Sequence, residues 1–276
     1  MIEVTSKYFD PFEIMESGQC FRWHKNENGR LSVIALERYI EIEKSGDTIR
    51  FFCDKCDWDN IWHDYFDMSR DYGYIDKLIS GTKDVHLKEA FKLGQGIRIL
   101  KQDLWEMIVS FMISQNNNIP RIKGSIEAIC ERAGIEAICE SHSIENVAVT
   151  KKYSFPGPLD VDISMFDDKS LGLGYRAPFL KDIFSFAREN PEWLDSLKSM
   201  NYEQAKAALM ERKGIGPKVA NCICLFGLGH VEAFPIDTHV KQLLDKYYSA
   251  GFDFEAFDGV AGIIQQYLFY YELMNK

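Results

Sequence analysis

The sequence contains no uncharged apolar run of roughly 18 residues or more, the length that a membrane-spanning helix requires. Residues 1–5 lack the basic and then apolar order of a secretion signal, so we expect no such signal. The seven cysteines are an odd number without the spacing of a disulfide framework, and we expect them to be reduced. Together these absences predict an intracellular protein, located in the cytoplasm or nucleoid if the source is prokaryotic.

Positive charge is also scarce, because the formal net charge is −10 at pH 7. Taken alone, this value argues against a polyanionic partner. Much of the acidic character, however, lies in residues 54–76, whereas residues 206–218 are mainly basic. Because the placement of charge matters more than its total, a locally basic segment on an acidic body remains compatible with DNA binding.

What is present is the composition of an ordinary globular protein, with 276 residues, of which 46% are hydrophobic and 27% charged. Residues 1–55 show strand patterns. They include an alternation of apolar and charged side chains over 39–43, typical of a half-exposed strand, and a turn signal at 26–30. From Trp58 onward the pattern becomes helical. We therefore predict an α+β fold, in which an N-terminal antiparallel β-sheet of about four or five strands precedes a mostly α-helical domain.

Local signals predict where several helices begin. Asp103 is typical of a helix cap, and Pro120 of the first turn of the next helix. Residues 258–274 predict a final helix. We place the domain boundary between residues 90 and 91, so that 1–90 form the β domain with flanking helices and 91–276 form the helical domain.

The most informative stretch is Gly214-Ile215-Gly216-Pro217-Lys218. Two glycines one residue apart favour a tight hairpin between two helices, and its N–H groups would form a seat for a phosphate. Pro217 suits a helix start, which places Lys218 in the first turn. There the positive end of the helix dipole disfavours an added proton, so this lysine is a candidate nucleophile. Asp237 would cap a later helix. Glycine turns and capping aspartates are also common as purely structural features, so these residues alone leave both interpretations open.

A resemblance to a known family supports the functional interpretation. Residues 213–239 resemble the helix-hairpin-helix motif, with its Gly/Pro-rich loop and aspartate, of a superfamily of DNA base-excision glycosylases. Within that superfamily, residues 218–225 and 235–239 are similar to the catalytic blocks of the 8-oxoguanine DNA glycosylases. Further similar stretches cover almost the whole chain in the family's order: Ser17-Gly18-Gln19-Cys20-Phe21-Arg22-Trp23, Ser114-Gln115-Asn116-Asn117-Asn118-Ile119-Pro120-Arg121, Leu171-Gly172-Leu173-Gly174-Tyr175-Arg176-Ala177, and Gln265 with Phe269.

The resemblance implies a base-excision repair enzyme that flips 8-oxoguanine, paired with cytosine, out of duplex DNA. Lys218 would attack the sugar and form a Schiff base, which breaks the N-glycosidic bond, and β-elimination would then nick the strand. Asp237 would stabilise the positive charge that develops on the sugar and take part in activating the nucleophile. The implied enzyme is therefore both a DNA glycosylase and a lyase at abasic sites. We expect it to act as a monomer on double-stranded DNA, in a cleft between helical subdomains, without a metal or organic cofactor.

The resemblance also implies roles for further residues. Gly18 would offer its backbone carbonyl to the N7–H that distinguishes 8-oxoguanine from guanine, and Gln265 would bond the Watson–Crick edge of the flipped base. Phe269 and Cys222 would contact the two faces of that base. The other implied DNA contacts are Asn116 in the gap left in the duplex, Arg121 and Arg176 on the orphaned cytosine, Tyr175 as a wedge beside it, and Gly214, Gly216 and His239 on the backbone.

Two alternatives remain for the helix-hairpin-helix segment. One is a glycosylase for alkylated bases that uses Asp237 to support attack by water, although such an enzyme needs no lysine at position 218. The other is a DNA-binding module without catalytic activity, which keeps the hairpin for phosphate contacts alone. The iron–sulfur branch of the superfamily is excluded because no cysteine follows Cys224. Cys53 and Cys56 have the spacing of half a zinc site, but no second pair accompanies them.

Overall fold

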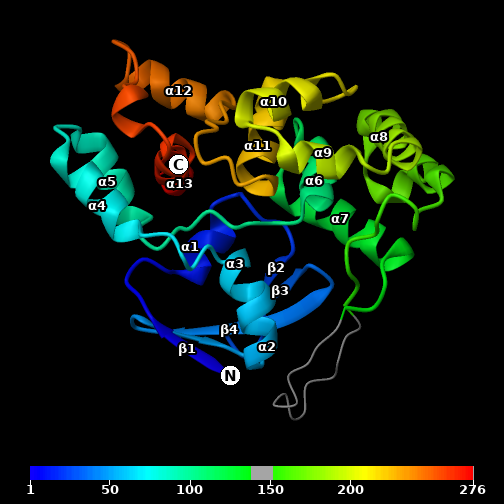
Figure 1. Cartoon of the computed structure of the whole chain (residues 1–276), viewed down its shortest axis with the longest axis horizontal. Helices are drawn as coiled ribbons and strands as arrows, with labels where there is room; N and C mark the ends of the chain where they lie inside the picture. The colour runs from blue at the N-terminus through cyan, green and yellow to red at the C-terminus, as the bar shows by residue number, and fades with distance from the viewer. Residues whose placement is uncertain (138–151, 276) are drawn as a thin grey trace.

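The computed structural model describes residues 1–137 and 152–275, which form a five-stranded antiparallel sheet and a larger set of helices (Figure 1). The sheet has the strand order β1-β5-β4-β3-β2. Its strands are β1 (Ile2–Thr5), β2 (Trp23–Lys25), β3 (Leu31–Ala35), β4 (Arg38–Ser45) and β5 (Thr48–Phe51). The predicted α+β fold and N-terminal sheet are confirmed. The alternating segment 39–43 lies in β4, where Ile40 and Ile42 share one buried face.

Glu41, on the other face of β4, is buried rather than half-exposed as predicted. Its carboxylate accepts a hydrogen bond from Asn26 Nδ2 at 3.0 Å and pairs with Arg30 Nη1 at 3.1 Å. The side chains of the 26–30 turn therefore cover this face of the strand. The alternation of apolar and charged residues predicts that the two faces of the strand differ. It does not predict that another segment covers the face that carries the charged residues.

The helix α1 (Pro11–Glu16) lies within residues 1–55, where the sequence analysis predicted strands and named no helix. Its start is encoded locally, because Asp10 Oδ1 accepts hydrogen bonds from the N–H groups of Phe12 and Glu13, and Pro11 occupies the first turn. The sequence signal for this helix was therefore present. α1 ends at Glu16 with Ser17 as its C-cap, directly before Gly18, and so fixes where the segment 17–23 enters the interior.

The rest of the described chain is mainly helical. Its elements are α2 (Lys55–Asp57), the π-helix η1 (Trp58–Trp62), α3 (His63–Tyr65), α4 (Tyr72–Gly81), α5 (Val85–Leu93), α6 (Leu104–Ser114), α7 (Ile119–Ala133), the 3₁₀ turns η2 (Ile163–Asp167), η3 (Lys169–Leu171) and η4 (Gly174–Arg176), α8 (Ala177–Glu189), α9 (Trp193–Ser199), α10 (Tyr202–Met210), α11 (Pro217–Gly227), α12 (Thr238–Tyr247), the 3₁₀ turn η5 (Glu255–Phe257) and α13 (Ala261–Met274). Asp103 caps α6, and Pro120 lies in the first turn of α7, as predicted. α13 begins three residues later than the predicted 258 and ends as predicted. Among the described residues, no helix is long and apolar enough to cross a membrane.

The two larger hydrophobic cores both include side chains of the non-helical segment 97–103: Leu100 belongs to the first core, and Ile97 and Ile99 belong to the second. The first core packs aromatic rings under the sheet, for example Phe51 and Phe66 with ring centroids 5.0 Å apart. The second fills the helical part and includes side chains of α4 and α5. Between the cores, Lys101 N–H donates to Tyr65 O at 3.0 Å and Gln102 N–H to Phe226 O at 3.1 Å. The domain boundary at residues 90 and 91 stays a prediction.

A buried charged cluster also joins the β-sheet region to α6 and α7. Arg22 Nε lies 3.1 Å from Glu127 Oε1. Burial would raise the pKa of the Glu127 carboxyl, but hydrogen bonds and charge from His24 and Arg22 lower it to about 2. Burial instead raises the pKa of Glu106 in α6 to about 8, although the charge of Arg22 opposes the rise. One carboxyl in the cluster is therefore ionised, and its neighbour holds a proton at neutral pH.

The Glu106→Gln variant is expected to gain stability relative to the wild-type protein as the pH rises. The folded chain binds the Glu106 proton more tightly than the unfolded chain, so this stabilisation is full below the ordinary carboxyl pKa and is lost as the pH rises through about 8. Gln mimics the protonated acid at every pH. Thermal unfolding should give similar midpoints at about pH 5 and a midpoint higher by a few degrees for the variant at about pH 9. A difference that does not change with pH would contradict this account.

Candidate active site and DNA-binding surface

The predicted order of helix, glycine hairpin and helix is confirmed between α10 and α11. Gly214 has φ +82°, and a Cβ there would lie 2.7 Å from Phe179 Cγ, so both backbone strain and crowding require glycine. Ile215 N–H closes the turn by donating to Arg212 O at 3.1 Å. Gly216 is the N-cap of α11, and among the described residues no side chain caps this helix. The first amides of α11 are thus left for an outside acceptor such as a phosphate.

Lys218 lies in the first turn of α11, as predicted, and is partly buried. Its Nζ is 5.5 Å from the ring centroid of Phe111 in α6, and an aromatic face attracts an ammonium group. The Phe111 ring is fixed in turn by stacking on Phe226, with centroids 5.5 Å apart, and by an edge contact with Phe21 at 5.6 Å. The amine of Lys218 therefore lies over an aromatic ring that is itself held by two other aromatic rings.

Lys218, Cys222 and Asp237 form one electrostatic group. Burial raises the pKa of the Cys222 thiol, the charge and hydrogen bonding of Lys218 oppose that rise, and the charge of Asp237 adds to it. Asp237 is the N-cap of α12, as predicted, and its Oδ1 accepts from Val240 N–H at 2.8 Å. Because a carboxylate has two oxygens, capping leaves Oδ2 for another partner. The starts of α11 and α12 thus bring a lysine, a neutral thiol and a carboxylate together.

Of the residues predicted to bind the base, Cys222 lies on α11, whereas Gln265 and Phe269 lie on α13 and Gly18 on the 17–23 segment. Gln265 is buried, and its Nε2 donates to Pro235 O at 3.2 Å, two residues before Asp237. Its Oε1 accepts from Gln266 Nε2 at 3.1 Å, so one amide hydrogen and one acceptor position of Gln265 remain for a ligand. Phe269 is partly exposed, and a Cβ on Gly18 would lie 3.1 Å from its Cε1. The structure therefore places Gly18 directly against the ring of Phe269.

A second group gathers around the main-chain carbonyl of Gln115, at the end of α6. Tyr175 Oη donates to this carbonyl at 3.1 Å and Arg176 Nε at 2.8 Å. Arg176 Nη2 also donates to Asn116 O at 2.8 Å. Asn116 is exposed and has φ +46°, a left-handed conformation that asparagine tolerates better than most residues. Three predicted DNA contacts, Asn116, Tyr175 and Arg176, are thus held together by hydrogen bonds.

Arg176 and Arg121 differ in how they are presented. Arg176 is only 5% exposed, and its guanidinium donates to main-chain carbonyls, including Leu173 O at 3.2 Å. Contact with an orphaned cytosine stays a prediction, and it requires this guanidinium to exchange a carbonyl for the base. Arg121 is exposed on α7 and lines a cleft of about 740 Å³ with Gly174 and Ala177. His239 is exposed in the first turn of α12, and its predicted backbone contact is not tested.

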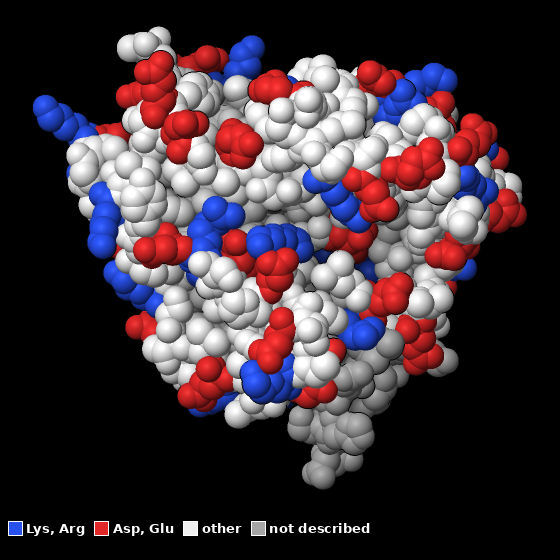
Figure 2. Space-filling view, viewed as in Figure 1, with Lys and Arg blue, Asp and Glu red and all other residues white. Residues whose placement is uncertain are grey.

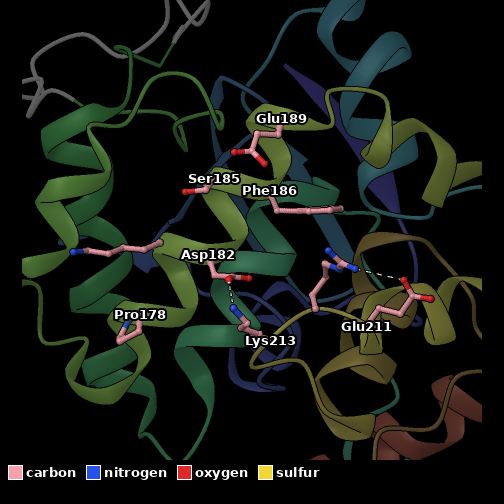
Figure 3. A pocket seen from close by; sticks show the side chains of 9 residues that line it. Pro178, Asp182, Ser185, Phe186, Glu189, Glu211 and Lys213 are labelled. Atoms are coloured by element: carbon pink, nitrogen blue, oxygen red, sulfur yellow. Dashed lines mark hydrogen bonds and ion pairs between the residues drawn. The ribbon is translucent and has the colours of Figure 1, made fainter.

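A different pocket, of about 550 Å³, borders the hairpin but includes none of the predicted site residues (Figure 3). It lies between α8 and residues 211–213, and in it Lys213 Nζ pairs with Asp182 Oδ1 at 2.9 Å. On the face seen in Figure 2, basic and acidic side chains are intermingled. Among residues 1–137 and 152–275, no group of three or more His, Cys, Asp or Glu side chains could hold a metal ion.

Two residues that support these groups, Phe111 and Gln115, were not predicted from the sequence. Phe111, under Lys218, has no local signal beyond its place on the apolar face of α6. Gln115 belongs to a stretch that was singled out, but no role was assigned to its side chain. Both act through contacts with α11 and its hairpin about one hundred residues later in the chain, for example Gln115 Nε2 with Gly214 O at 2.9 Å. Helix periodicity and capping signals do not report contacts over that separation.

Comparisons with known proteins agree with this arrangement. Residues 1–108 match the family described as 8-oxoguanine DNA glycosylase, N-terminal domain. The chain is 28% identical over 249 residues to N-glycosylase/DNA lyase OGG1 of Arabidopsis thaliana, a match that covers 84% of this chain and 64% of that protein. It is 35% identical over 166 residues to the N-glycosylase/DNA lyase of Saccharomyces cerevisiae, covering 56% of this chain and 42% of that protein. The matched part is thus less than two thirds of the length of either relative.

A solved structure matches over the whole length. The Clostridium acetobutylicum 8-oxoguanine glycosylase/lyase, crystallised with double-stranded DNA containing cytosine opposite to 8-oxoG, is 34% identical, with a TM-score of 0.87. The match covers 100% of this chain and 98% of that one. From its sequence blocks, its fold and this full-length similarity, the chain belongs to the 8-oxoguanine DNA glycosylase/lyase family.

Proposed function

We propose that the protein excises 8-oxoguanine opposite cytosine from double-stranded DNA and then cleaves the strand as a lyase. The observation that carries this proposal is the grouping of Lys218, Cys222 and Asp237, with Gln265 bonded to the backbone two residues before Asp237. The proposed nucleophile and carboxylate both act on the Cys222 thiol, and the proposed base-binding amide contacts the backbone close to that carboxylate. Family membership supports the same activity.

Lys218 and Asp237 carry the bond-breaking steps of the proposed reaction. Lys218, as a neutral amine, forms a bond through Nζ to C1′ of the flipped nucleotide, and the N-glycosidic bond breaks, so that the base leaves with the bonding electron pair. Asp237 stabilises the positive charge that develops on the sugar. Loss of a proton from the amine and opening of the sugar give a Schiff base. This group acidifies the C2′ proton, whose removal expels the 3′ phosphate and nicks the strand.

Base recognition is assigned to the residues around Phe269. The flipped base would stack on the Phe269 ring with one face and contact the uncharged Cys222 side chain with the other. Both surfaces suit a neutral planar base. Gln265 keeps one donor and one acceptor position for the Watson–Crick edge. Gly18 lies beside the Phe269 ring. Guanine has no N7–H to donate to the Gly18 carbonyl, and leaving that carbonyl unpaired would cost the binding of guanine roughly 1–3 kcal/mol.

The two alternatives differ in their expected products. A monofunctional glycosylase leaves an abasic site without a Schiff base, and a DNA-binding module leaves the DNA intact. Lys218 on its aromatic support argues against both, because neither requires a partly buried lysine at the start of α11. The same proposal places the protein inside the cell, where its substrate is found. The six cysteines that the structure describes are free, whereas Cys139 lies outside the described residues.

Excision rates should depend strongly on the base opposite the lesion. Arg121 and Arg176 are assigned to the orphaned cytosine, and a bidentate arginine contact discriminates by about 1–3 kcal/mol, or roughly 5- to 150-fold. Under single-turnover conditions, 8-oxoguanine opposite cytosine should be removed at least about tenfold faster than opposite adenine, and undamaged guanine should not be removed. Equal rates opposite all four bases would contradict the arginine assignments. Failure to remove 8-oxoguanine from any duplex would contradict the proposed function.

A further inference from the structure

We propose that Gln115 is a positioning residue, which ties the phosphate-binding hairpin to the loop that carries Asn116. This proposal rests on the proposed function and extends it to a residue outside the predicted site. Gln115 itself need not touch DNA. Its side chain and its main-chain carbonyl instead hold the two segments that do, at a fixed separation.

The side chain of Gln115 makes the link to the hairpin. Its Nε2 donates to Gly214 O at 2.9 Å and to Met112 O at 3.1 Å, so both amide hydrogens are used. Met112 lies in α6, which packs against α11. Gly214 lies at the tip of the hairpin and is pressed against Phe179. The amide of Gln115 therefore bridges the end of one helix and the turn that precedes another.

The main-chain carbonyl of Gln115 links α6 to Tyr175, the predicted wedge, and to Arg176. Tyr175 Oη and Arg176 Nε converge on it, and Arg176 also holds the carbonyl of Asn116. A left-handed non-glycine residue such as Asn116 persists only where its surroundings fix it. These hydrogen bonds provide that restraint.

Through Gln115, the position of the hairpin on the DNA backbone determines the position of Asn116 in the duplex. The hairpin makes a second contact through the ion pair between Lys213 and Asp182 of α8 (Figure 3). A phosphate bound at the start of α11 therefore fixes Gly214, and Gln115 passes that position on to Asn116. We therefore expect the position of Asn116 relative to the bound DNA backbone to be fixed. Asn116 then fills the gap in the duplex and stabilises the state in which the base is flipped out.

The Gln115→Met variant tests this proposal, because methionine keeps the length of the side chain and removes both donors. The excision rate of 8-oxoguanine opposite cytosine should fall about fivefold to tenfold under single-turnover conditions with saturating enzyme. Strand cleavage at a preformed abasic site, which has no base to extrude, should change less than about twofold. Hydrogen exchange in the protein without DNA should speed up in residues 115–118 and 212–216, but not in the sheet.

A matched control is Asn60→Leu, which removes a side-chain hydrogen bond to a main-chain carbonyl, Asn60 Nδ2 to Cys56 O at 2.9 Å, at an exposed site in the sheet region. It should leave both rates and the exchange of residues 115–118 unchanged. Equal losses of excision and abasic-site cleavage in Gln115→Met, or faster exchange throughout the protein, would show a general structural role and overturn the proposal. So would an unchanged excision rate.

The same assays distinguish failure of the Gln115 proposal from failure of the proposed function. If the wild-type protein removes 8-oxoguanine and Gln115→Met does so equally well, only the role of Gln115 is overturned. If the wild-type protein removes no 8-oxoguanine, the proposed function fails, and the positioning role fails with it.

Discussion

Replacing Lys218 with Gln is expected to abolish excision of 8-oxoguanine, with a loss of about 10³-fold or more in the single-turnover rate. Gln cannot form a Schiff base, so borohydride should trap no protein–DNA adduct. The protein should still bind the lesion duplex within a few-fold of the wild-type affinity, because the hairpin and the start of α11 are unchanged. Gel-based excision, trapping and binding assays on the same duplex measure the three quantities.

The matched control for this variant is Lys198→Gln, the same chemical change at an exposed lysine of α9 that pairs with Asp195. It should excise and trap like the wild-type protein. An adduct of undiminished yield in Lys218→Gln would show that another amine is the nucleophile. A large loss of DNA affinity in that variant would show instead that the lysine mainly holds the DNA.

Asp237→Asn is expected to have the second largest effect, a fall of about 10²- to 10³-fold in the excision rate with little change in affinity for DNA. The structure makes this variant informative, because Asp237 both caps α12 and lies in the group with Lys218 and Cys222. Asn is as good an N-cap as Asp, so its Oδ1 can still accept from Val240 N–H. Only the negative charge is lost, and with it the stabilisation of the charged sugar.

Asp237→Ala provides the comparison, because it removes the charge and the cap together. It should lose activity to a similar extent and in addition lose about 1 kcal/mol of stability, which thermal unfolding measures. If Asp237→Asn lowered excision and DNA affinity equally, the carboxylate would act mainly by holding the fold of the α12 start. If it retained wild-type activity, the electrostatic role would be wrong.

Helix starts were predictable because their signals are local. An N-cap aspartate accepts a hydrogen bond from an unpaired amide of the first turn, as Asp103 and Asp237 do. A proline in the first turn has no amide hydrogen to pair, as at Pro120 and Pro217, and the structure confirms all four helix starts. The same kind of signal, Asp10 followed by Pro11, was present before α1, where the strand patterns around it dominated the interpretation. Local chemistry therefore predicts helices even inside a β-rich segment.

Contacts over long sequence separations were not predictable in this way. The family resemblance implies that Arg176 contacts DNA, but the sequence does not reveal that the guanidinium is buried on carbonyls of the loop after α6. Nor does it reveal that Gln115 reaches the hairpin. Each of these contacts depends on how α6, η4 and the hairpin are packed, and that packing is set by the whole helical core. The resemblance to a family identified the residues, whereas the structure shows what holds them.

The net charge illustrates the same limit. A value of −10 would suggest avoidance of DNA. The structure offers instead an uncapped helix start at α11, where amides are available to a phosphate regardless of the overall charge. Phosphate contacts of this kind depend on a few oriented N–H groups. A total charge summed over the chain does not report them.

The central claim, that Lys218 is the nucleophile, is tested most directly by mapping the trapped adduct. The wild-type protein is incubated with a duplex containing 8-oxoguanine opposite cytosine in the presence of borohydride, digested, and analysed by mass spectrometry. One DNA-linked peptide, modified at Lys218, is expected, and none with an undamaged duplex. An adduct mapped to a different lysine, or excision without any adduct, would contradict this claim.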